Sequence, residues 1–254
     1  MATHVKGRAP GRRVVLFMIL AALVAGGPLP GVSAQEDLAR AGADVYGRYC
    51  IGCHGEKGDG KGKASGLLVV KPRDFSTGVF EFKSTPPGSL PTDEDLMRTI
   101  MRGLPGNSMP GYALLPESER RAVIAYIKTF AERWKTETAP PPLPIPAVPA
   151  DFGSPDSLQK GREAYRLNGC AICHGESGDG KGPAAAALRD ARGNPDKPRN
   201  FVRGVYESGD LPNDLFRTLT TGIEGTPMPA FPQIPDGDRW NLIAYLLSLR
   251  EDRP

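Results

Sequence analysis

The chain has 254 residues, of which 39% are hydrophobic and 24% charged, and these proportions are those of a globular protein. The length allows one large domain or two of ordinary size. A formal net charge of +3 is too small to indicate a nucleic-acid-binding face or a basic membrane-binding surface.

The first 34 residues have the layout of a secretory leader. Basic residues at positions 6, 8, 12 and 13 precede the apolar run Val14–Ala25, and Val32-Ser33-Ala34 supplies small residues for cleavage. That run has 12 residues, whereas a bilayer span takes about 20, so a cleaved leader is favoured over a retained anchor. We therefore expect export to the periplasm and a mature chain from Gln35, with 28 basic residues against 29 acidic ones, a net charge of −1.

A helix over residues 36–50 is expected to lead into Cys50-Ile51-Gly52-Cys53-His54, a Cys-x-x-Cys-His haem-attachment pattern. The pattern recurs as Cys170-Ala171-Ile172-Cys173-His174, so the two copies hold all four cysteines. Thiols about one helical turn apart can each form a thioether with a haem vinyl group, and the adjacent histidine reaches the iron from the same side. The sequence predicts two covalently bound haem c groups, at Cys50, Cys53 and His54 and at Cys170, Cys173 and His174.

A Cys-x-x-Cys pair alone also fits a structural disulfide, a thioredoxin-like redox pair or half of a zinc site. The Gly/Pro-rich sequence around both pairs lacks the βαβ pattern of a thioredoxin-like motif. A zinc site of four thiolates does not require a histidine directly after each pair. Haem attachment is the interpretation that uses all of these residues.

An internal repeat follows the first motif. Residues 55–62 match residues 175–182, and Pro72-Arg73-Asp74-Phe75 matches Pro198-Arg199-Asn200-Phe201. Two copies of a unit of about 100 residues indicate two small domains. We place these domains at 35–138 and 151–254.

The glycine-rich stretches lack the Ser/Thr of a phosphate-binding loop, so we interpret them as turns at the haem edge around Asp59 and Asp179.

The second helix of the first copy is expected from Thr92, which supplies a cap before an acidic first turn, and its counterpart over 213–220. A third helix is expected over 117–134 and 236–249, where apolar residues recur at helical spacing. No strand pattern competes with these helices, so the predicted fold is all-α.

Each copy also places one methionine between its second and third helices. Met109 follows His54 by 55 residues and Met228 follows His174 by 54, each before a proline in a Gly/Pro-rich loop. A loop methionine can simply fill a gap in the core. Two at matching positions instead favour axial ligands, and a methionine ligand closes the iron for electron transfer.

Met97 and Met101 have no methionine counterpart in the second copy, and we assign both to core packing.

Residues 139–150 contain six prolines, a composition typical of an extended polyproline II segment that acts as a semi-rigid spacer. The spacer either fixes a relay between the two haems or serves as a plain linker.

Each half resembles a class I bacterial cytochrome c domain, over residues 38–134 and 157–249. The resemblance rests on the Cys-x-x-Cys-His motif at the end of the first helix, the Met-Pro loop and an aromatic residue in the last helix. It implies two tandem cytochrome c-type helical domains, each wrapped around one covalently bound haem. It also implies that the first and last helices cross, near Tyr46 with Tyr126 and near Tyr165 with Tyr245, and that the carbonyls of Pro72 and Pro198 orient the histidines.

The function that follows is electron transfer, without catalysis, between a redox protein donor and a redox protein acceptor in a respiratory or oxidative chain. One alternative is a dihaem enzyme of the peroxidase or thiosulfate-oxidising type. Once the predicted leader, which contains His4, is removed, such an enzyme would have no histidine or cysteine outside the two motifs for an unusual ligand or nucleophile. A third possibility is a haem-based sensor or the cytochrome subunit of an oxidoreductase complex, including a membrane-bound oxidase or reductase.

Overall fold

The computed structural model describes residues 1–4, 7 and 30–251. Most of the predicted leader, residues 1–34, lies outside the described residues, and α1 begins upstream of the expected cleavage position, at Pro30. In the described part of the chain no helix is long and apolar enough to cross a membrane.

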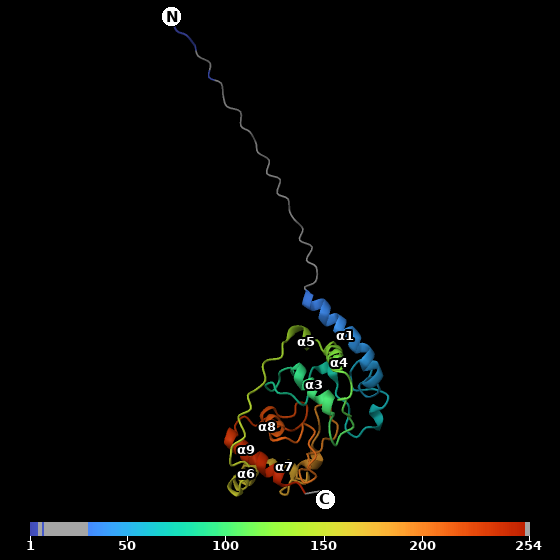
Figure 1. The fold of residues 1–254 in the computed structure, drawn as a ribbon, viewed down its shortest axis with the longest axis vertical. Coiled ribbons are helices and arrows are strands. Elements are labelled where there is room, and N and C mark those ends of the chain that lie inside the picture. Colours follow the sequence, from blue (N-terminus) through green and yellow to red (C-terminus); the bar gives the residue numbers. More distant parts are fainter. Residues whose placement is uncertain (5–6, 8–29, 252–254) are drawn as a thin grey trace.

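Helices form both halves of the molecule (Figure 1). The first half contains α1 (Pro30–Tyr49), α2 (Ile51–His54), α3 (Asp93–Arg102), α4 (Glu117–Lys128) and α5 (Arg133–Thr136). The second half contains α6 (Pro155–Leu167), α7 (Cys170–His174), α8 (Pro212–Thr221) and α9 (Asp236–Ser248). Between residues 30 and 251 the extended pairing is limited to an isolated bridge, Arg189 to Pro195. The all-α prediction is confirmed.

The start of α3 follows its predicted cap. The Thr92 hydroxyl accepts from the Asp95 amide at 3.2 Å, and the Asp95 carboxylate accepts from the Thr92 amide at 3.1 Å, which forms a reciprocal capping box. The expected end of the third helix at residue 134 is wrong, because α4 ends at Lys128. The chain turns there so that Phe130 packs against the Tyr46 ring, with 5.3 Å between ring centroids.

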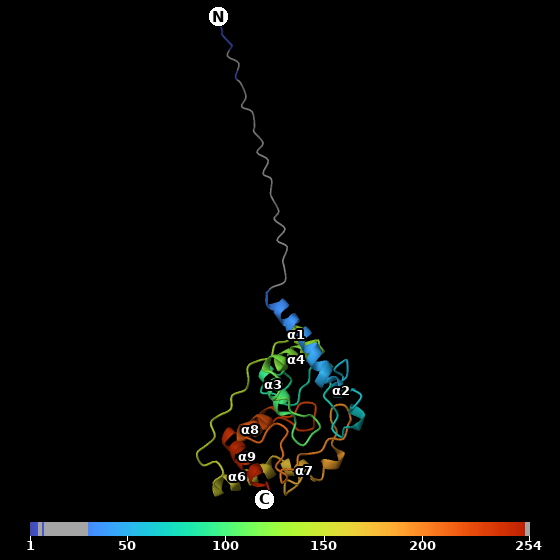
Figure 2. The same cartoon turned by 45° about the vertical axis from the view of Figure 1, so that its right-hand side comes forward.

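Each half is organised around one crossing pair of helices, α1 with α4 and α6 with α9 (Figures 1 and 2). The predicted tyrosine contacts lie at these crossings, with ring centroids 5.2 Å apart for Tyr46 and Tyr126 and 5.6 Å apart for Tyr165 and Tyr245. The sequence analysis did not single out Gly42, whose position leaves no room for a side chain. A Cβ at Gly42 would lie 2.0 Å from the backbone oxygen of Ala122 on α4.

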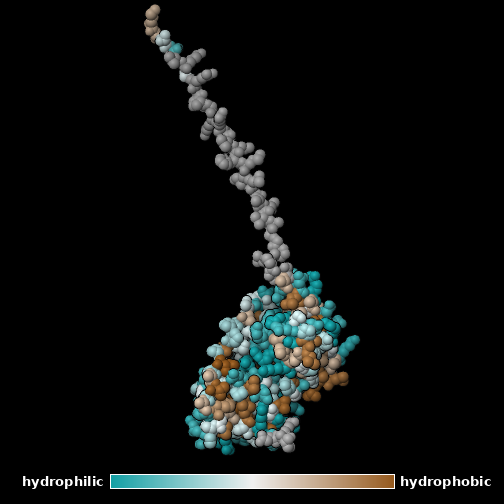
Figure 3. All heavy atoms as spheres, viewed as in Figure 1, coloured by the Kyte–Doolittle hydropathy of each residue, from teal (hydrophilic) through white to brown (hydrophobic). Residues whose placement is uncertain are grey.

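The two halves have separate hydrophobic cores. The first contains Val45, Tyr46, Phe75, Phe80, Leu96, Ile100, Val123, Ile124 and Ile127. The second contains Ala164, Tyr165, Phe201, Tyr206, Leu215, Phe216, Leu219, Ile234, Trp240, Leu242, Ile243 and Leu246. On the face drawn in Figure 3, hydrophilic side chains surround small hydrophobic clusters. The domain limits 35–138 and 151–254 stay a prediction.

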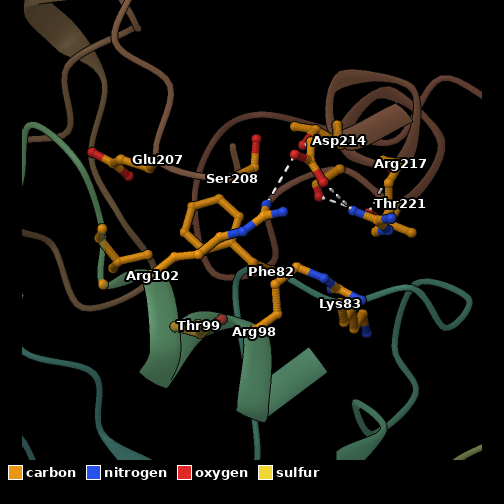
Figure 4. A pocket seen from close by; sticks show the side chains of 14 residues that line it. Phe82, Lys83, Arg98, Thr99, Arg102, Glu207, Ser208, Asp214, Arg217 and Thr221 are labelled. Carbon is orange, nitrogen blue, oxygen red and sulfur yellow. Dashed lines mark hydrogen bonds and ion pairs between the residues drawn. The ribbon is translucent and has the colours of Figure 1, made fainter. Parts of the chain in front are cut away.

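Directional polar contacts join the two halves. Arg102 of α3 pairs with Asp214 of α8 at 2.9 Å (Figure 4). Lys83, whose side chain is 1% exposed, pairs with Glu224. The linker 139–150 follows this interface, with the Leu143 amide donating to the Ser84 carbonyl at 2.8 Å. It contains neither helix nor strand, as expected of a proline-rich spacer.

A small cavity lies at this interface between α3 and α8 (Figure 4). Its volume of about 20 Å³ has room for about one water molecule. Four basic side chains line it, and each is paired with a carboxylate: Arg98 with Asp95, Arg102 and Arg217 with Asp214, and Lys83 with Glu224. The cavity is therefore part of an ion-paired interface and is too small for an organic ligand.

Gly42→Ala should lower the free energy of unfolding of the haem-loaded protein by about 1–3 kcal/mol, because the methyl group would separate α1 from α4. The measurement is a urea titration followed by far-UV circular dichroism. Gly47→Ala is the matched control, since nothing lies within 4 Å of a Cβ at that α1 position. That control should be neutral or stabilising by up to about 1 kcal/mol. Equal effects of the two substitutions would contradict the role of Gly42.

Candidate functional site

The first cysteine motif lies on a short helix that continues from α1 after a break. The Cys50 amide donates to the Tyr46 carbonyl at 2.9 Å, and α2 then carries Cys53 and His54. Gly55, with φ +79°, ends that helix, and its carbonyl accepts from the Tyr46 hydroxyl at 2.8 Å. In the second half, the Tyr165 hydroxyl donates to the equivalent carbonyl, that of Gly175, at 2.7 Å. A buried tyrosine therefore fixes each motif to the helix before it.

The four cysteines are free and half-buried, so their thiols are available for thioether bonds. Burial, with a smaller effect of Cys53, raises the pKa of Cys50 to about 11. Burial likewise raises the pKa of Cys170 to about 11. A thioredoxin-like pair needs a thiol with a lowered pKa, and the burial of Cys50 and Cys170 acts in the opposite direction.

The glycine-rich stretch after each motif folds back onto it. In the first half, the Gly60 amide donates to the His54 carbonyl at 2.9 Å and the Gly62 amide to the Cys53 carbonyl at 3.0 Å. The Asp59 carboxylate accepts from the Lys61 amide at 3.1 Å, and Asp179 makes the same turn in the second half. The interpretation of these stretches as turns is confirmed.

A backbone carbonyl orients each motif histidine, but it belongs to an arginine. His54 Nδ1 lies 3.1 Å from the Arg73 carbonyl, and His174 Nδ1 lies 2.9 Å from the Arg199 carbonyl. The prediction of Pro72 and Pro198 was therefore wrong by one residue. The Pro72 carbonyl instead accepts from Arg192 of the other half, at 2.9 Å.

The pKa values of His54 and His174 are both lowered, mainly because the two imidazoles are buried. A neutral imidazole carries one N–H, and a carbonyl partner requires that hydrogen on Nδ1. The lone pair of Nε2 is then free for a metal.

Each ring is also stacked on a phenylalanine, with 4.4 Å between the centroids of His54 and Phe75 and 4.5 Å between those of His174 and Phe201. These phenylalanines belong to the sequence repeat, which was the signal that could have identified them.

Met109 and Met228 occupy equivalent turns of equivalent loops. The Met109 carbonyl accepts from the Leu104 amide at 3.0 Å, and the Met228 carbonyl accepts from the Ile223 amide at 3.0 Å. Met109 packs against the first core and Met228 against the second.

The two cores also bring the other predicted residues together. Cys50 packs against the first core and Cys170 against the second, while each histidine reaches its core through the stacked phenylalanine. Each half thus brings one thiol, one imidazole and one thioether to an apolar core, and the second thiol directly precedes the histidine in the chain. This donor set fits a covalently attached haem.

The two methionines of α3, Met97 and Met101, differ from each other in exposure. Met97 packs against the first core, as expected. Met101 is 38% exposed, so its assignment to core packing was wrong. It lies in the last turn of α3.

A buried arginine that the sequence analysis missed holds each methionine loop. Arg239, on α9, donates to the Phe231 carbonyl at 3.1 Å and to the Ile234 carbonyl at 2.8 Å. In the first half, Arg120 on α4 donates to the Ala113 carbonyl at 2.9 Å and to the Leu115 carbonyl. Helices α4 and α9 therefore anchor the segment that follows the Met-Pro pair in their halves.

Comparison with known proteins agrees with this geometry. Residues 37–127 match the family described as cytochrome C oxidase, cbb3-type, subunit III, and residues 158–250 match the family described as cytochrome c. A chain of the reducing HAO-like protein complex of Kuenenia stuttgartiensis is 38% identical, with a TM-score of 0.80. That alignment covers 83% of the present chain and 96% of the other. No curated protein matches the chain.

The chain belongs to the dihaem cytochromes c. Its two cytochrome c domains bind two haem c groups covalently and transfer electrons through them. We refer to the two halves as the first and second domains from here on.

Arg239→Ala should lower the free energy of unfolding by about 2–4 kcal/mol, because the buried carbonyls of the methionine loop lose charged donors. Thermal unfolding followed by circular dichroism measures this loss. Arg121→Ala is the control, since this residue forms an exposed i,i+4 pair with Glu117 and should contribute about 0–1 kcal/mol. A change at Arg239 no larger than that at Arg121 would refute the anchoring role.

Proposed function

We propose that this cytochrome is a periplasmic electron carrier with two closed irons, one ligated by His54 and Met109 and the other by His174 and Met228. The equivalence of the two methionine positions carries this proposal. Each methionine carbonyl accepts from the amide five residues earlier, and each side chain packs on the core that the haem-attachment motif also contacts. Coincidental gap-filling does not account for this double match.

The attachment residues follow from the same reasoning. We assign the thioethers to Cys50 and Cys53 in the first domain and to Cys170 and Cys173 in the second. A bound haem c supplies one-electron exchange at its iron. The protein contributes a histidine of fixed tautomer on one side and a methionine on an anchored loop on the other.

The proposed methionine ligands also affect the reduction potential of each haem. A thioether stabilises ferrous iron more than a second imidazole does, which raises the reduction potential. The hydrogen bond from each histidine and the anchored loops keep both ligands in place in either oxidation state. Such sites suit rapid exchange with protein donors and acceptors and disfavour the binding of a small substrate at iron.

Export to the periplasm rests on the leader-like sequence of residues 1–34. The covalent haem is consistent with it, and so is the absence of any further cysteine outside the two motifs.

A second candidate function is that of the cytochrome subunit of an oxidoreductase complex. The 38% identical chain from Kuenenia stuttgartiensis belongs to a reducing HAO-like protein complex, and the alignment covers almost all of that chain. In this case one of the two redox partners would be a permanent neighbour. The chemistry at both irons would be unchanged.

Replacement of Cys170 and Cys173 by serine should leave one covalent haem per chain, because the first motif is intact. Pyridine haemochrome quantitation against protein mass measures the stoichiometry, and mass spectrometry under denaturing conditions locates the remaining haem. The reciprocal replacement of Cys50 and Cys53 should leave the other. Retention of two covalent haems in either variant would disprove the attachment sites.

Met228→Ala should open the second iron without release of its haem, since the thioethers do not involve this residue. The weak far-red band of ferric methionine-ligated haem should fall to about half of its intensity, and the ferrous protein should bind about one carbon monoxide per chain. Met97→Leu is the matched control, because Met97 is a core residue and should leave the spectrum unchanged. A full-intensity band in Met228→Ala would overturn the ligand assignment.

A further inference from the structure

The arginines that orient the two histidines also reach across the interdomain interface. The Arg73 side chain extends to Gly225 in the second domain, where a Cβ would lie 2.8 Å from Arg73 Nη1. The Arg199 side chain extends to Gly106 in the first domain, where a Cβ would lie 3.2 Å from Arg199 Nη1. Gly106 and Gly225 hold equivalent positions, each three residues before the methionine of its loop.

Each guanidinium is held in this position from its own side. Arg73 pairs with Glu81 and Arg199 with Glu207, and the two arginine side chains are only 19% and 29% exposed. Burial is the main effect that lowers the pKa of Arg73 to about 10, so its guanidinium stays charged at neutral pH. A paired, buried guanidinium is a rigid group, and its contact with the opposite loop is therefore fixed.

The glycines make the contact feasible. Gly225 has φ +84° and Gly106 has φ +78°, a region that residues with a side chain rarely adopt. A side chain at Gly225 would also collide with Arg73, and one at Gly106 would come within 3.1 Å of Val205 Cγ1. Each methionine loop is thus shaped to accept the arginine of the other domain.

The loop of the second domain has further contacts with the first. Glu224, next to Gly225, pairs with Lys83 and accepts from the Gly88 amide at 3.0 Å. The Gly225 carbonyl accepts from the Ala191 amide of its own domain at 2.9 Å. The turn that leads to Met228 is therefore held partly by the first domain.

We propose that Arg73 and Arg199 are positioning residues that act on both haem sites, on the histidine of their own domain through the backbone and on the methionine loop of the other domain through the side chain. The inference rests on the proposed His/Met ligation. The consequence is that a substitution of the arginine in one domain changes the strength of the methionine–iron bond in the other domain. Such coupling between sites is reciprocal.

The test uses a background in which the far-red methionine band reports one haem only. Met109→His removes the thioether of the first domain, so the remaining band belongs to the second haem. Imidazole is then added to the ferric protein, and the concentration that halves the band measures how firmly Met228 is bound. Arg73→Lys in this background keeps the charge but removes the planar guanidinium.

We expect Arg73→Lys to lower the half-point concentration of imidazole about five- to tenfold, the lower end of the usual coupling between protein sites. Arg121→Lys is the matched control, with the same exchange at an exposed position of α4, and should leave the half-point unchanged. An unchanged half-point in Arg73→Lys would overturn the proposal.

The mirror-image test is independent of the first. Arg199→Lys in a Met228→His background is read at the haem of the first domain, with the same expected decrease. It keeps the proposal open to refutation if Arg73→Lys fails to fold. Failure of the proposed function would look different, because the protein without substitutions would then lack a far-red band of two-site intensity.

Discussion

The direction of one imidazole N–H in each domain governs the rest of the site. A buried neutral histidine must satisfy its N–H group, and the arginine carbonyls at 3.1 and 2.9 Å do so for His54 and His174. This bond leaves the lone pair of the other ring nitrogen free for the proposed bond to iron. The stacked phenylalanine fixes the ring plane, and the glycine-rich turn fixes the end of the helix that carries the histidine. The crossing of the first and last helices closes the core around them.

The same arginines connect this local constraint to the interface between the domains. An interface built from ion pairs gains little stability, because removing charges from water costs much of what their attraction contributes. Directional contacts of this kind instead fix a relative orientation. Arg102 with Asp214 and Lys83 with Glu224 are such contacts, and the proline-rich linker limits the alternatives. Electron exchange between the haems benefits from a defined geometry more than from a tight association.

Features encoded by nearby residues could be predicted from the sequence. The cysteine motifs, the cap at Thr92 and the matched methionines depend on local spacing and on the repeat. The carbonyl that orients each histidine could not be identified in this way, because its identity depends on the path of a loop whose length differs between the copies. The contact of Lys83 with Glu224 joins residues 141 positions apart in the sequence, so local sequence patterns do not predict it. Gly42 was overlooked because the close approach of α4 is visible only in three dimensions.

The duplication explains why the interface is nearly symmetric and where it is not. A surface that meets its own copy must be self-complementary, so that residue i contacts j and j contacts i. Arg73 with Gly225 and Arg199 with Gly106 obey this rule. The second copy has six more residues between its motif and its Pro-Arg pair than the first, and Arg192 lies in that stretch.

Arg192 breaks the symmetry at the first haem site. It donates to the Pro72 carbonyl and contributes, after burial and Arg73, to the lowered pKa of His54. For His174 the cationic neighbour that acts in this way is Arg199, of its own domain. The stretch that the second copy has gained therefore gives His54 a cationic neighbour from the other domain.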